Sequence, residues 1–482
     1  MILHLIPIDM VAQTRNPLYR SALMIARTLH NAGHKAFFAG GCVRDLLLGL
    51  APKDFDVATS ATPDEVTALF PRTQSVGAHF GVILVLDSTE SPDETIATEV
   101  ATFRNDGIYI DGRRPDAVRF STDPLEDVIR RDFTINGMLL DPIAFEKSGN
   151  IKSSTLDAVG GQADLFARIL RAIGDPATRF AEDKLRMLRA IRFAARLELE
   201  IDPATFAAIR AQAAGINKVS PERISAELTR MLTEGHARRA FELLDASGLL
   251  AYVLPEATRL KGVAQPPQYH PEGDVWTHTL LLLENLPAGC STTLAWGALL
   301  HDIGKPATYT PPNPTVPGDR IRFNGHVEVG VRMAEVILHR LRFSNDDSAQ
   351  IVALIKNHMR FGDILNMRQA TLKRFLRLPQ FEEHLALHKL DCTASHGDLR
   401  LYDFAKQRFE EDPAEDVRPK PFVTGRDLIL AGYRPGTQFK EMLETAEDAQ
   451  LDGVVTTREE ALALLKERFG SPPQAFSTLT SA

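Results

Sequence analysis

A glycine pair followed closely by two aspartates places the tightest limit on how this chain can fold. Apolar residues 36–39 lead into Gly40 and Gly41, and an amphipathic segment, 43–50, follows. This order predicts a strand, a glycine turn and a helix, an arrangement whose exposed backbone N–H groups can face an anionic ligand. An ordinary glycine turn without a ligand fits the same residues.

The two aspartates are Asp54 and Asp56, on either side of Phe55. If residues 55–59 form a strand, both carboxylates lie on one face, because side chains alternate along a strand. Two such carboxylates repel unless a cation lies between them, and a hard divalent ion with oxygen ligands is the natural candidate. A phosphate cradle beside a metal-binding pair indicates phosphoryl or nucleotidyl transfer. A solvated aspartate pair is the alternative.

Glu99 is a third candidate carboxylate, within residues 95–103, which alternate as a strand. It could complete a two-metal site or act as a base toward an attacking hydroxyl. An outward-facing acid on a half-buried strand is the alternative. A helix predicted over 17–31 and another beginning at Thr62 interleave with these strands, so the first part of the chain is predicted to be α+β.

Two further charged motifs follow. Residues 130–136 offer adjacent arginines, an acid and an amide as donors and acceptors for phosphate and sugar hydroxyls, although a solvated charge run is the alternative. Residues 182–197 predict one strong helix in which Glu182, Arg186 and Arg189 share a face. Salt bridges within the helix would explain these charges without any ligand.

Taken in order, these motifs resemble the class II tRNA nucleotidyltransferase and bacterial poly(A) polymerase family. The resemblance covers residues 35–195 and continues into 219–256. It implies a polymerase-β-like head that extends an RNA 3′ end without a nucleic-acid template. By this resemblance Asp54 and Asp56 would hold catalytic Mg²⁺, and Glu99 stays the third catalytic candidate on the strength of its strand position alone. The nucleotide-binding residues would be Gly40, Gly41 and Arg44 at the triphosphate, and Arg131, Asp132, Asn136, Asp183, Arg186 and Arg189.

In that family the residues that match Asp183 and Arg186 act as a protein template. A carboxylate accepts from an exocyclic amino group and a guanidinium donates to ring N3 or O2, so the pair can select cytosine and adenine. Guanine and uracil present the wrong pattern of hydrogen-bond donors and acceptors. The arginines of residues 165–196, including Arg192, are predicted to form a local basic track for RNA.

A second group of metal-ligand residues lies later in the chain. Imidazoles and carboxylates at helix ends suit a divalent transition metal. Their order resembles the all-helical HD phosphohydrolase superfamily. The resemblance implies a first metal on His278, His301, Asp302 and Asp391, a second completed by His326 and His358, and a bound metal that activates water for phosphoester hydrolysis. A vestigial site is the alternative.

The expected fold is therefore an α+β polymerase-β-like nucleotidyltransferase head, followed by an all-helical neck and body and an all-helical HD domain. A length of 482 residues predicts about three domains. We expect the head over 1–150, the neck and body with tRNA binding over 151–262, the HD domain over 269–400 and a helical C-terminal extension over 401–482.

Composition excludes several classes. Three widely spaced cysteines fit neither a disulfide framework nor a zinc knuckle, and a net charge of −8 argues against coating nucleic acid wholesale. No apolar run reaches the ~20 residues that span a membrane, and the first residues do not resemble a signal peptide, so we expect a cytoplasmic protein.

The leading functional hypothesis is addition of CCA to the tRNA 3′ end from CTP and ATP. An enzyme that adds only A or only CC is the alternative within the family. Poly(A) polymerase is less favoured, because residues 76–81 lack a double-basic run. From another class, the protein could be an HD phosphohydrolase with a degenerate transferase head. The oligomeric state is left open.

Overall fold

The computed structural model of the protein describes residues 15–77, 81–88, 95–106, 118–411 and 420–471. The chain divides into two compact units, Met1–Thr258 and Arg259–Ala482. Within the described ranges, no helix has the length and hydropathy that crossing a bilayer requires.

The first unit is built on a mixed sheet, whose described strands have the order β3-β4-β5-β2-β1-β8-β9. Neighbouring strands are antiparallel, except that β2 and β5 run parallel. Ala39 pairs with Asp56, so the turn that follows β1 lies beside the aspartates at the start of β2. The strands are β1 (Ala36–Ala39), β2 (Asp56–Thr59), β3 (Thr73–Gly77), β4 (Val82–Ser88), β5 (Thr95–Thr102), β8 (Leu139–Leu140) and β9 (Thr155–Leu156).

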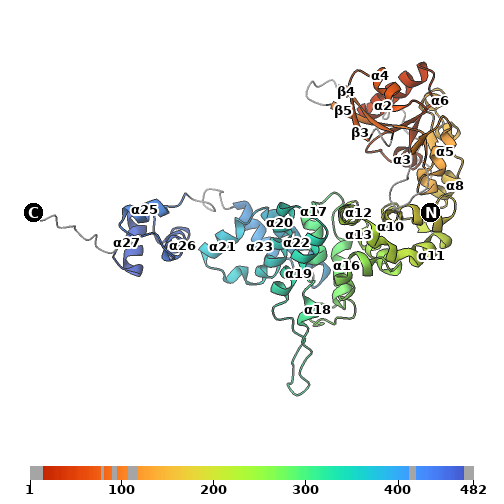
Figure 1. The fold of residues 1–482 in the computed structure, drawn as a ribbon. Helices are drawn as coiled ribbons and strands as arrows, with labels where there is room; N and C mark the ends of the chain where they lie inside the picture. Colours follow the sequence, from red (N-terminus) through yellow and green to blue (C-terminus); the bar gives the residue numbers. More distant parts are fainter. Residues whose placement is uncertain (1–14, 78–80, 89–94, 107–117, 412–419, 472–482) are drawn as a thin grey trace, which may run out of the picture. The chain divides into compact units, whose positions relative to one another are not determined.

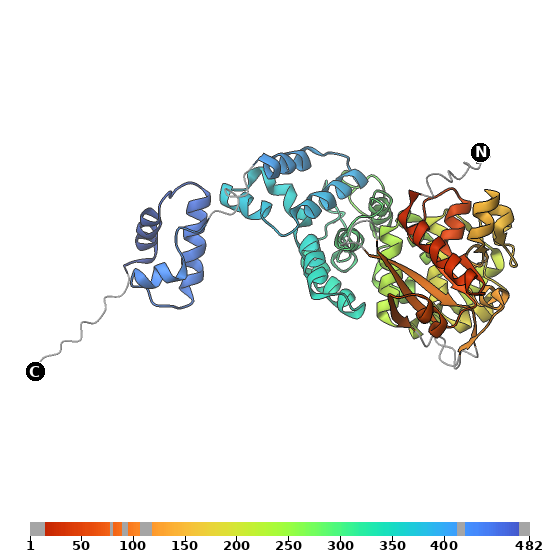
Figure 2. The ribbon, with the colours of Figure 1, turned by 90° about the horizontal axis from the view of Figure 1, so that it is seen from above.

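Helix α2 (Pro17–Asn31) packs against β1, β2 and β5, and Figure 2 shows it in red across the sheet. Asn16 caps its first turn and Pro17 lies in that turn, as expected for a helix start. The predicted cap at Thr62 is also present, as a capping box that begins α4 (Pro63–Leu69). The helices predicted at both positions are confirmed.

The rest of the first unit is mainly helical. A two-residue parallel ladder joins β10 (Ile169–Leu170) to β11 (Glu200–Ile201). The remaining helices are α3 (Gly41–Leu47), α5 (Pro124–Ile129), η2 (Thr134–Asn136), α6 (Pro142–Ser148), α7 (Ile151–Ser154), α8 (Gly161–Phe166), α9 (Pro176–Glu182), α10 (Leu185–Arg196), α11 (Pro203–Gln212), η3 (Ala213–Lys218), α12 (Pro221–Thr233), α13 (Ala237–Ala246), α14 (Leu250–Val253) and α15 (Pro255–Thr258).

The single helix predicted over 182–197 is wrong. Helix α9 ends at Glu182, Asp183 is extended with φ −141° and ψ 108°, and α10 begins at Leu185. The Leu185 N–H donates to Asp183 Oδ1 at 3.0 Å. A short polar side chain that accepts from the backbone favours the start of a helix over its interior, which explains the break.

The second unit is helical, with a segment between α18 and α19 that projects from the helices (Figure 1). The backbones of Thr310 and Arg322 pair across that segment. The helices are α16 (Val275–Glu284), α17 (Thr292–Leu300), α18 (Lys305–Thr308), α19 (His326–Arg340), α20 (Asn345–Asn357), η4 (His358–Asn366), α21 (Gln369–Leu376), α22 (Phe381–Ala394), α23 (Arg400–Glu411), α25 (Gly425–Leu430), α26 (Gln438–Leu451) and α27 (Arg458–Phe469).

Candidate active site and metal centre

The glycine turn joins β1 to α3 and lies beside two guanidinium groups. Gly40 has φ +75°, a conformation that side chains with a Cβ rarely adopt. A Cβ on Gly40 would lie 3.4 Å from Arg131 Nη1, and one on Gly41 would lie 3.5 Å from Arg44 Nη2. The turn therefore places backbone beside two cations, which suits an anionic ligand.

Three carboxylates lie near one another where β2 begins beside the middle of β5. Asp56 begins β2 and is half-buried, exposed Asp54 precedes it, and Glu99 lies on β5. The parallel register, with Val57 opposite Val100, puts Asp56 beside Glu99. Burial, and then the charges of Asp54 and Glu99, raise the pKa of Asp56 to about 7. A divalent cation would relieve this repulsion, so the donor set fits one.

A cavity of about 490 Å³ opens beside the turn. Among the described residues of the predicted head site, Glu99 alone does not line it. The predicted residues that do are Gly40, Gly41, Arg44, Asp54, Asp56, Arg131, Asp132, Asn136, Asp183, Arg186 and Arg189.

Hydrogen bonds fix the floor of this cavity. Arg44 donates to Asn136 Oδ1 at 2.7 Å and pairs with Asp45 at 2.6 Å. Asp132 accepts from the Asn136 amide at 3.1 Å and from Arg189 Nε at 2.8 Å. Although burial opposes it, the Arg189 charge and these hydrogen bonds hold the pKa of Asp132 below its usual value. The floor is thus a closed network of charged and amide groups.

Asp183 and Arg186 line the same cavity but are held by different partners. Asp183 Oδ2 lies 2.8 Å from Arg223 Nη2. Arg186 pairs with Glu182 at 2.6 Å, the salt bridge that the sequence offered as an alternative, and also donates to the Arg130 carbonyl at 2.9 Å. The protein itself therefore holds both side chains in defined orientations at the wall of the cavity.

One arginine of the predicted RNA track is buried, which corrects that expectation. The Arg192 side chain is 1% exposed and pairs with Glu227 at 2.7 Å and Glu234 at 3.3 Å. Its guanidinium lies 4.3 Å from the centre of the Phe193 ring. Arg192 therefore holds α10 against α12 and is not available to an RNA backbone.

Sequence reasoning gave no role to Arg223 or Glu227, both on α12. Their signal was weak, because Arg223 falls in the first turn of a helix for which the sequence suggested no functional residue. The spacing of four residues, which puts both side chains on one face of α12, was the signal available.

In the second unit, four histidines use the same ring nitrogen, Nδ1, for a hydrogen bond to the protein. A carbonyl or carboxylate accepts from Nδ1 in each case: Glu272 from His278 at 2.7 Å, Ala298 from His301 at 2.9 Å, Phe323 from His326 at 2.8 Å and Ile355 from His358 at 2.7 Å. Because those oxygens only accept, Nδ1 carries a proton, and Nε2 is the ring nitrogen left to face a ligand, which makes the four histidines candidate metal ligands. Glu272 was not predicted.

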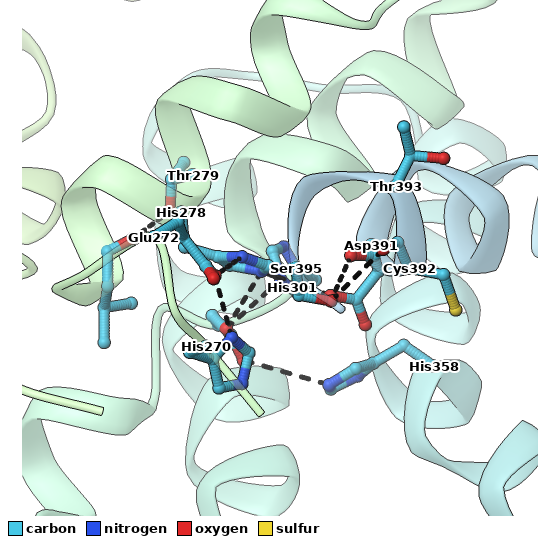
Figure 3. Close-up of polar contacts among 12 residues, drawn as sticks. His270, Glu272, His278, Thr279, His301, His358, Asp391, Cys392, Thr393 and Ser395 are labelled. Carbon is cyan, nitrogen blue, oxygen red and sulfur yellow. Dashed lines mark hydrogen bonds and ion pairs between the residues drawn. The ribbon is translucent and has the colours of Figure 1, made fainter. Parts of the chain in front are cut away.

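These nitrogens form two groups. His278, His301 and Asp391 offer ligand atoms within 4.8 Å of one another, as do Asp302, His326 and His358. Figure 3 shows His278, His301 and Asp391 pointing toward one another.

Asp302 lies between the two groups, with Oδ2 3.2 Å from His301 Nε2 and Oδ1 3.9 Å from both His326 and His358 Nε2. His278 and His301 Nε2 are only 3.3 Å apart, and the buried His326 Nε2 has no hydrogen-bond partner within the described ranges. This donor set fits divalent metal ions.

Gly304 brings the two groups together. A Cβ there would lie 2.1 Å from the His326 carbonyl and 2.6 Å from the Gly330 nitrogen. Glycine thus allows the start of α19 to approach the segment after α17. Beside the candidate metal ligands lies a cavity of about 690 Å³, lined in part by Tyr269, Lys305 and Arg320.

Comparison with known families matches three parts of the chain. Residues 36–171 match the poly A polymerase head domain, and 275–392 match the HD domain. Residues 198–261 match the family described as "Probable RNA and SrmB- binding site of polymerase A".

The CCA-adding enzyme of Bacillus pumilus is 37% identical over 454 residues, which is 93% of this chain and 96% of that protein. The chain belongs to the CCA-adding enzyme family. The Geobacillus thermodenitrificans member is 42% identical over 237 residues, 49% of this chain and about half, 55%, of that protein.

Solved structures of the family have the same fold. The CCA-adding enzyme of Bacillus stearothermophilus in complex with CTP aligns with a TM-score of 0.70 and 27% identity, over 94% of this chain and 98% of that one. The Thermotoga maritima enzyme complexed with tRNA is 17% identical, with a TM-score of 0.54 over 94% and 96% of the two chains, which supports the fold alone. The expected fold class is confirmed.

Proposed function

We propose that this protein adds CCA to the 3′ end of tRNA from CTP and ATP, without a nucleic-acid template. One observation carries the proposal: a single cavity is lined both by the carboxylates Asp54 and Asp56 and by the base-reading candidates Asp183 and Arg186. Membership of the CCA-adding enzyme family supports it, and so does the binding of CTP by the similar enzyme of Bacillus stearothermophilus.

Asp54 and Asp56 would hold Mg²⁺, with Glu99 alongside. When bound there, magnesium supplies charge stabilisation to the attacking and leaving oxygens. The tRNA 3′-hydroxyl oxygen forms a bond to the α-phosphorus of the nucleotide. The bond between that phosphorus and the bridging oxygen breaks, pyrophosphate leaves, and the hydroxyl proton is lost.

The chain's own residues bind and orient the reactants. Arg44 and Arg131 lie beside the glycine turn, where their guanidinium groups would bind the anionic triphosphate. The Asp183 carboxylate accepts from the exocyclic amino group of cytosine or adenine, and the Arg186 guanidinium donates to the ring. Uracil and guanine would each leave a polar atom unpaired against this pair, which disfavours their binding.

The decisive experiment supplies three tRNAs, ending at the discriminator base, at C and at CC, with CTP and ATP separately. CCA addition requires C on the first two substrates and A on the third. A on the third substrate alone, or C alone, would identify the narrower enzymes, and a long A tract would identify a poly(A) polymerase. Asp54→Asn with Asp56→Asn should abolish incorporation, while Asp64→Asn, an aspartate in the first turn of α4, should retain it.

A second activity, metal-dependent phosphoester hydrolysis, is favoured by the four histidine Nε2 atoms around Asp302. The residues that would hold a divalent transition metal are His278, His301, Asp302, Asp391, His326 and His358. Lys305, Arg320 and Arg322 line the adjoining cavity and provide charges for a phosphate group. Water would supply the oxygen that replaces the ester oxygen on phosphorus.

The four-part division into head, neck and body, HD domain and C-terminal extension belongs to the same proposal, as does a cytoplasmic location. A helical body next to the head would carry the acceptor arm of tRNA. The C-terminal extension has its own small core, which includes Leu428, Met442 and Leu465.

A further inference from the structure

One buried carboxylate anchors two arginines of the candidate active site. Asp127 lies on α5, and its side chain is 1% exposed. Its Oδ1 accepts from Arg130 Nε at 2.9 Å and Nη2 at 2.5 Å, and its Oδ2 accepts from Arg131 Nε at 3.1 Å and Nη2 at 2.8 Å. Each oxygen is thus used twice, by a different guanidinium. Both arginines line the cavity.

Arg131 extends from this anchor to the phosphate end of the cavity. Its Nη1 lies 3.4 Å from the Cβ position of Gly40 and donates to the Asn136 carbonyl at 3.5 Å. Its charge also lowers the pKa of Asp56, in opposition to the carboxylates around it. The guanidinium that Asp127 holds therefore faces both the glycine turn and the metal-binding candidates.

Arg130 extends from the same anchor to the base-reading end. Its side chain is tied to Asp127, and its carbonyl accepts from Arg186 Nη2 at 2.9 Å. The other Arg186 nitrogen donates to Glu182 at 2.6 Å and to the Arg179 carbonyl at 3.2 Å. The position of the Arg186 guanidinium thus depends on a main-chain oxygen that Asp127 helps to fix.

We propose that Asp127 is a positioning residue that couples the triphosphate end of the nucleotide site to its base-selecting end. The inference rests on the proposed transferase function. A nucleotide bound by its phosphates at Arg131 must present its base at a set distance to Arg186. Asp127 sets that distance, because its single carboxylate holds both Arg131 and Arg130.

The charge of Asp127 is essential to this role. An amide at the same place would turn N–H donors toward a guanidinium and could satisfy only one arginine. Asp127→Asn should therefore raise the KM for CTP and ATP about tenfold and lower the preference for CTP over UTP at least about fivefold, with kcat changed less than about threefold. Glu126→Gln, the neighbouring carboxylate on α5, is the matched control and should change neither.

A double-variant cycle separates coupling from general loosening. In an Arg186→Ala background, base selection through the guanidinium is already lost. Asp127→Asn should then cause no further loss of selectivity, yet still raise KM. Additive losses of selectivity in the double variant would overturn the proposal, as would unchanged KM and selectivity in Asp127→Asn alone.

Two further variants keep the test decisive if Asp127→Asn does not fold. Arg130→Met should reduce selectivity with little change in KM, and Arg131→Met should raise KM with selectivity kept. Equal effects of both on both readouts would overturn the proposal. If wild-type protein incorporates neither C nor A, the proposed function itself fails, which is a distinct result from an active enzyme whose variants do not differ.

Discussion

Arg223 Nη2 lies 2.8 Å from Asp183 Oδ2, so a residue forty positions later in the chain holds the carboxylate proposed to read the base. Asp183 sits in the extended break between α9 and α10, where no helix backbone fixes its side chain. The ion pair and the hydrogen bond from the Leu185 N–H together replace that constraint.

Arg223→Met should loosen nucleotide choice. Without its partner the Asp183 side chain can rotate, so we expect UTP incorporation to rise relative to CTP by about tenfold, which corresponds to a loss of about 1.4 kcal/mol of discrimination. Competition between CTP and UTP on tRNA lacking CCA measures this ratio. Arg210→Met, an exposed arginine on α11, is the control, and an unchanged ratio in Arg223→Met would contradict the role.

Glu272→Gln should weaken metal binding in the second unit. Glu272 Oε1 accepts from both His270 and His278, and loss of a carboxylate that orients a histidine ligand costs about 10–100-fold in metal affinity. Titration against a chelator of known affinity measures the change. Glu335→Gln, exposed on α19, should match wild type, and CCA addition should be unaffected in both variants. Equal affinity in Glu272→Gln and wild type would contradict the assignment.

Arg192→Met should destabilise the first unit by about 3 kcal/mol, because it leaves the buried Glu227 without its main counter-charge. Both tryptophans, Trp276 and Trp296, lie in the second unit, so fluorescence does not report this change. Hydrogen exchange of the α10 amides measures the loss of stability instead. Adding Glu227→Met should recover part of the loss, since an apolar pair avoids the unpaired charge. Further destabilisation in the double variant would contradict this account.

His384→Leu should make the second unit less sensitive to acid. Burial lowers the pKa of His384 to about 4, and neither ring nitrogen has a hydrogen-bond partner in the part of the chain that the structure describes. The unfolded chain, with a pKa near 6.5, binds the proton more readily, so wild-type stability falls as pH falls from about 6.5 to about 4, by at most about 1.4 kcal/mol per pH unit.

The His384→Leu variant should lose this pH-dependent contribution to the free energy of unfolding. Urea unfolding followed by tryptophan fluorescence at several pH values measures the slope, since Trp276 and Trp296 report on this unit. Curves that run parallel for wild type and His384→Leu would show that His384 does not titrate on unfolding. His339→Leu, exposed on α19, should leave the slope unchanged.

Local patterns were sufficient for much of the fold. The apolar spacing and caps of α2 and the alternation of β5 follow from contiguous residues, and the structure has both. The approach of Asp54 to Gly40 depends on the antiparallel pairing of β1 with β2, and strands that are consecutive in the chain often pair in this way. The parallel pairing that brings Glu99 beside Asp56 could not be predicted, because it joins segments far apart in the chain.

The partners of the charged groups were the other part that sequence could not supply. The face shared by Glu182, Arg186 and Arg189 predicted contacts within one helix. The first pair forms, but Arg189 pairs with Asp132 in another segment. Charged side chains are long, and burial selects partners from any element within reach, so periodicity identifies the face but not the partner.

Substitutions would affect the ring orientations of the four candidate metal-binding histidines to different extents. For His301, His326 and His358 the Nδ1 acceptor is a main-chain carbonyl, which no side-chain substitution at that position can delete. His278 alone among the four depends on a side chain, Glu272. In evolution, a single substitution of a candidate ligand or of Glu272 could therefore remove metal binding. Most substitutions of the surrounding side chains would leave the orientations of His301, His326 and His358 unchanged.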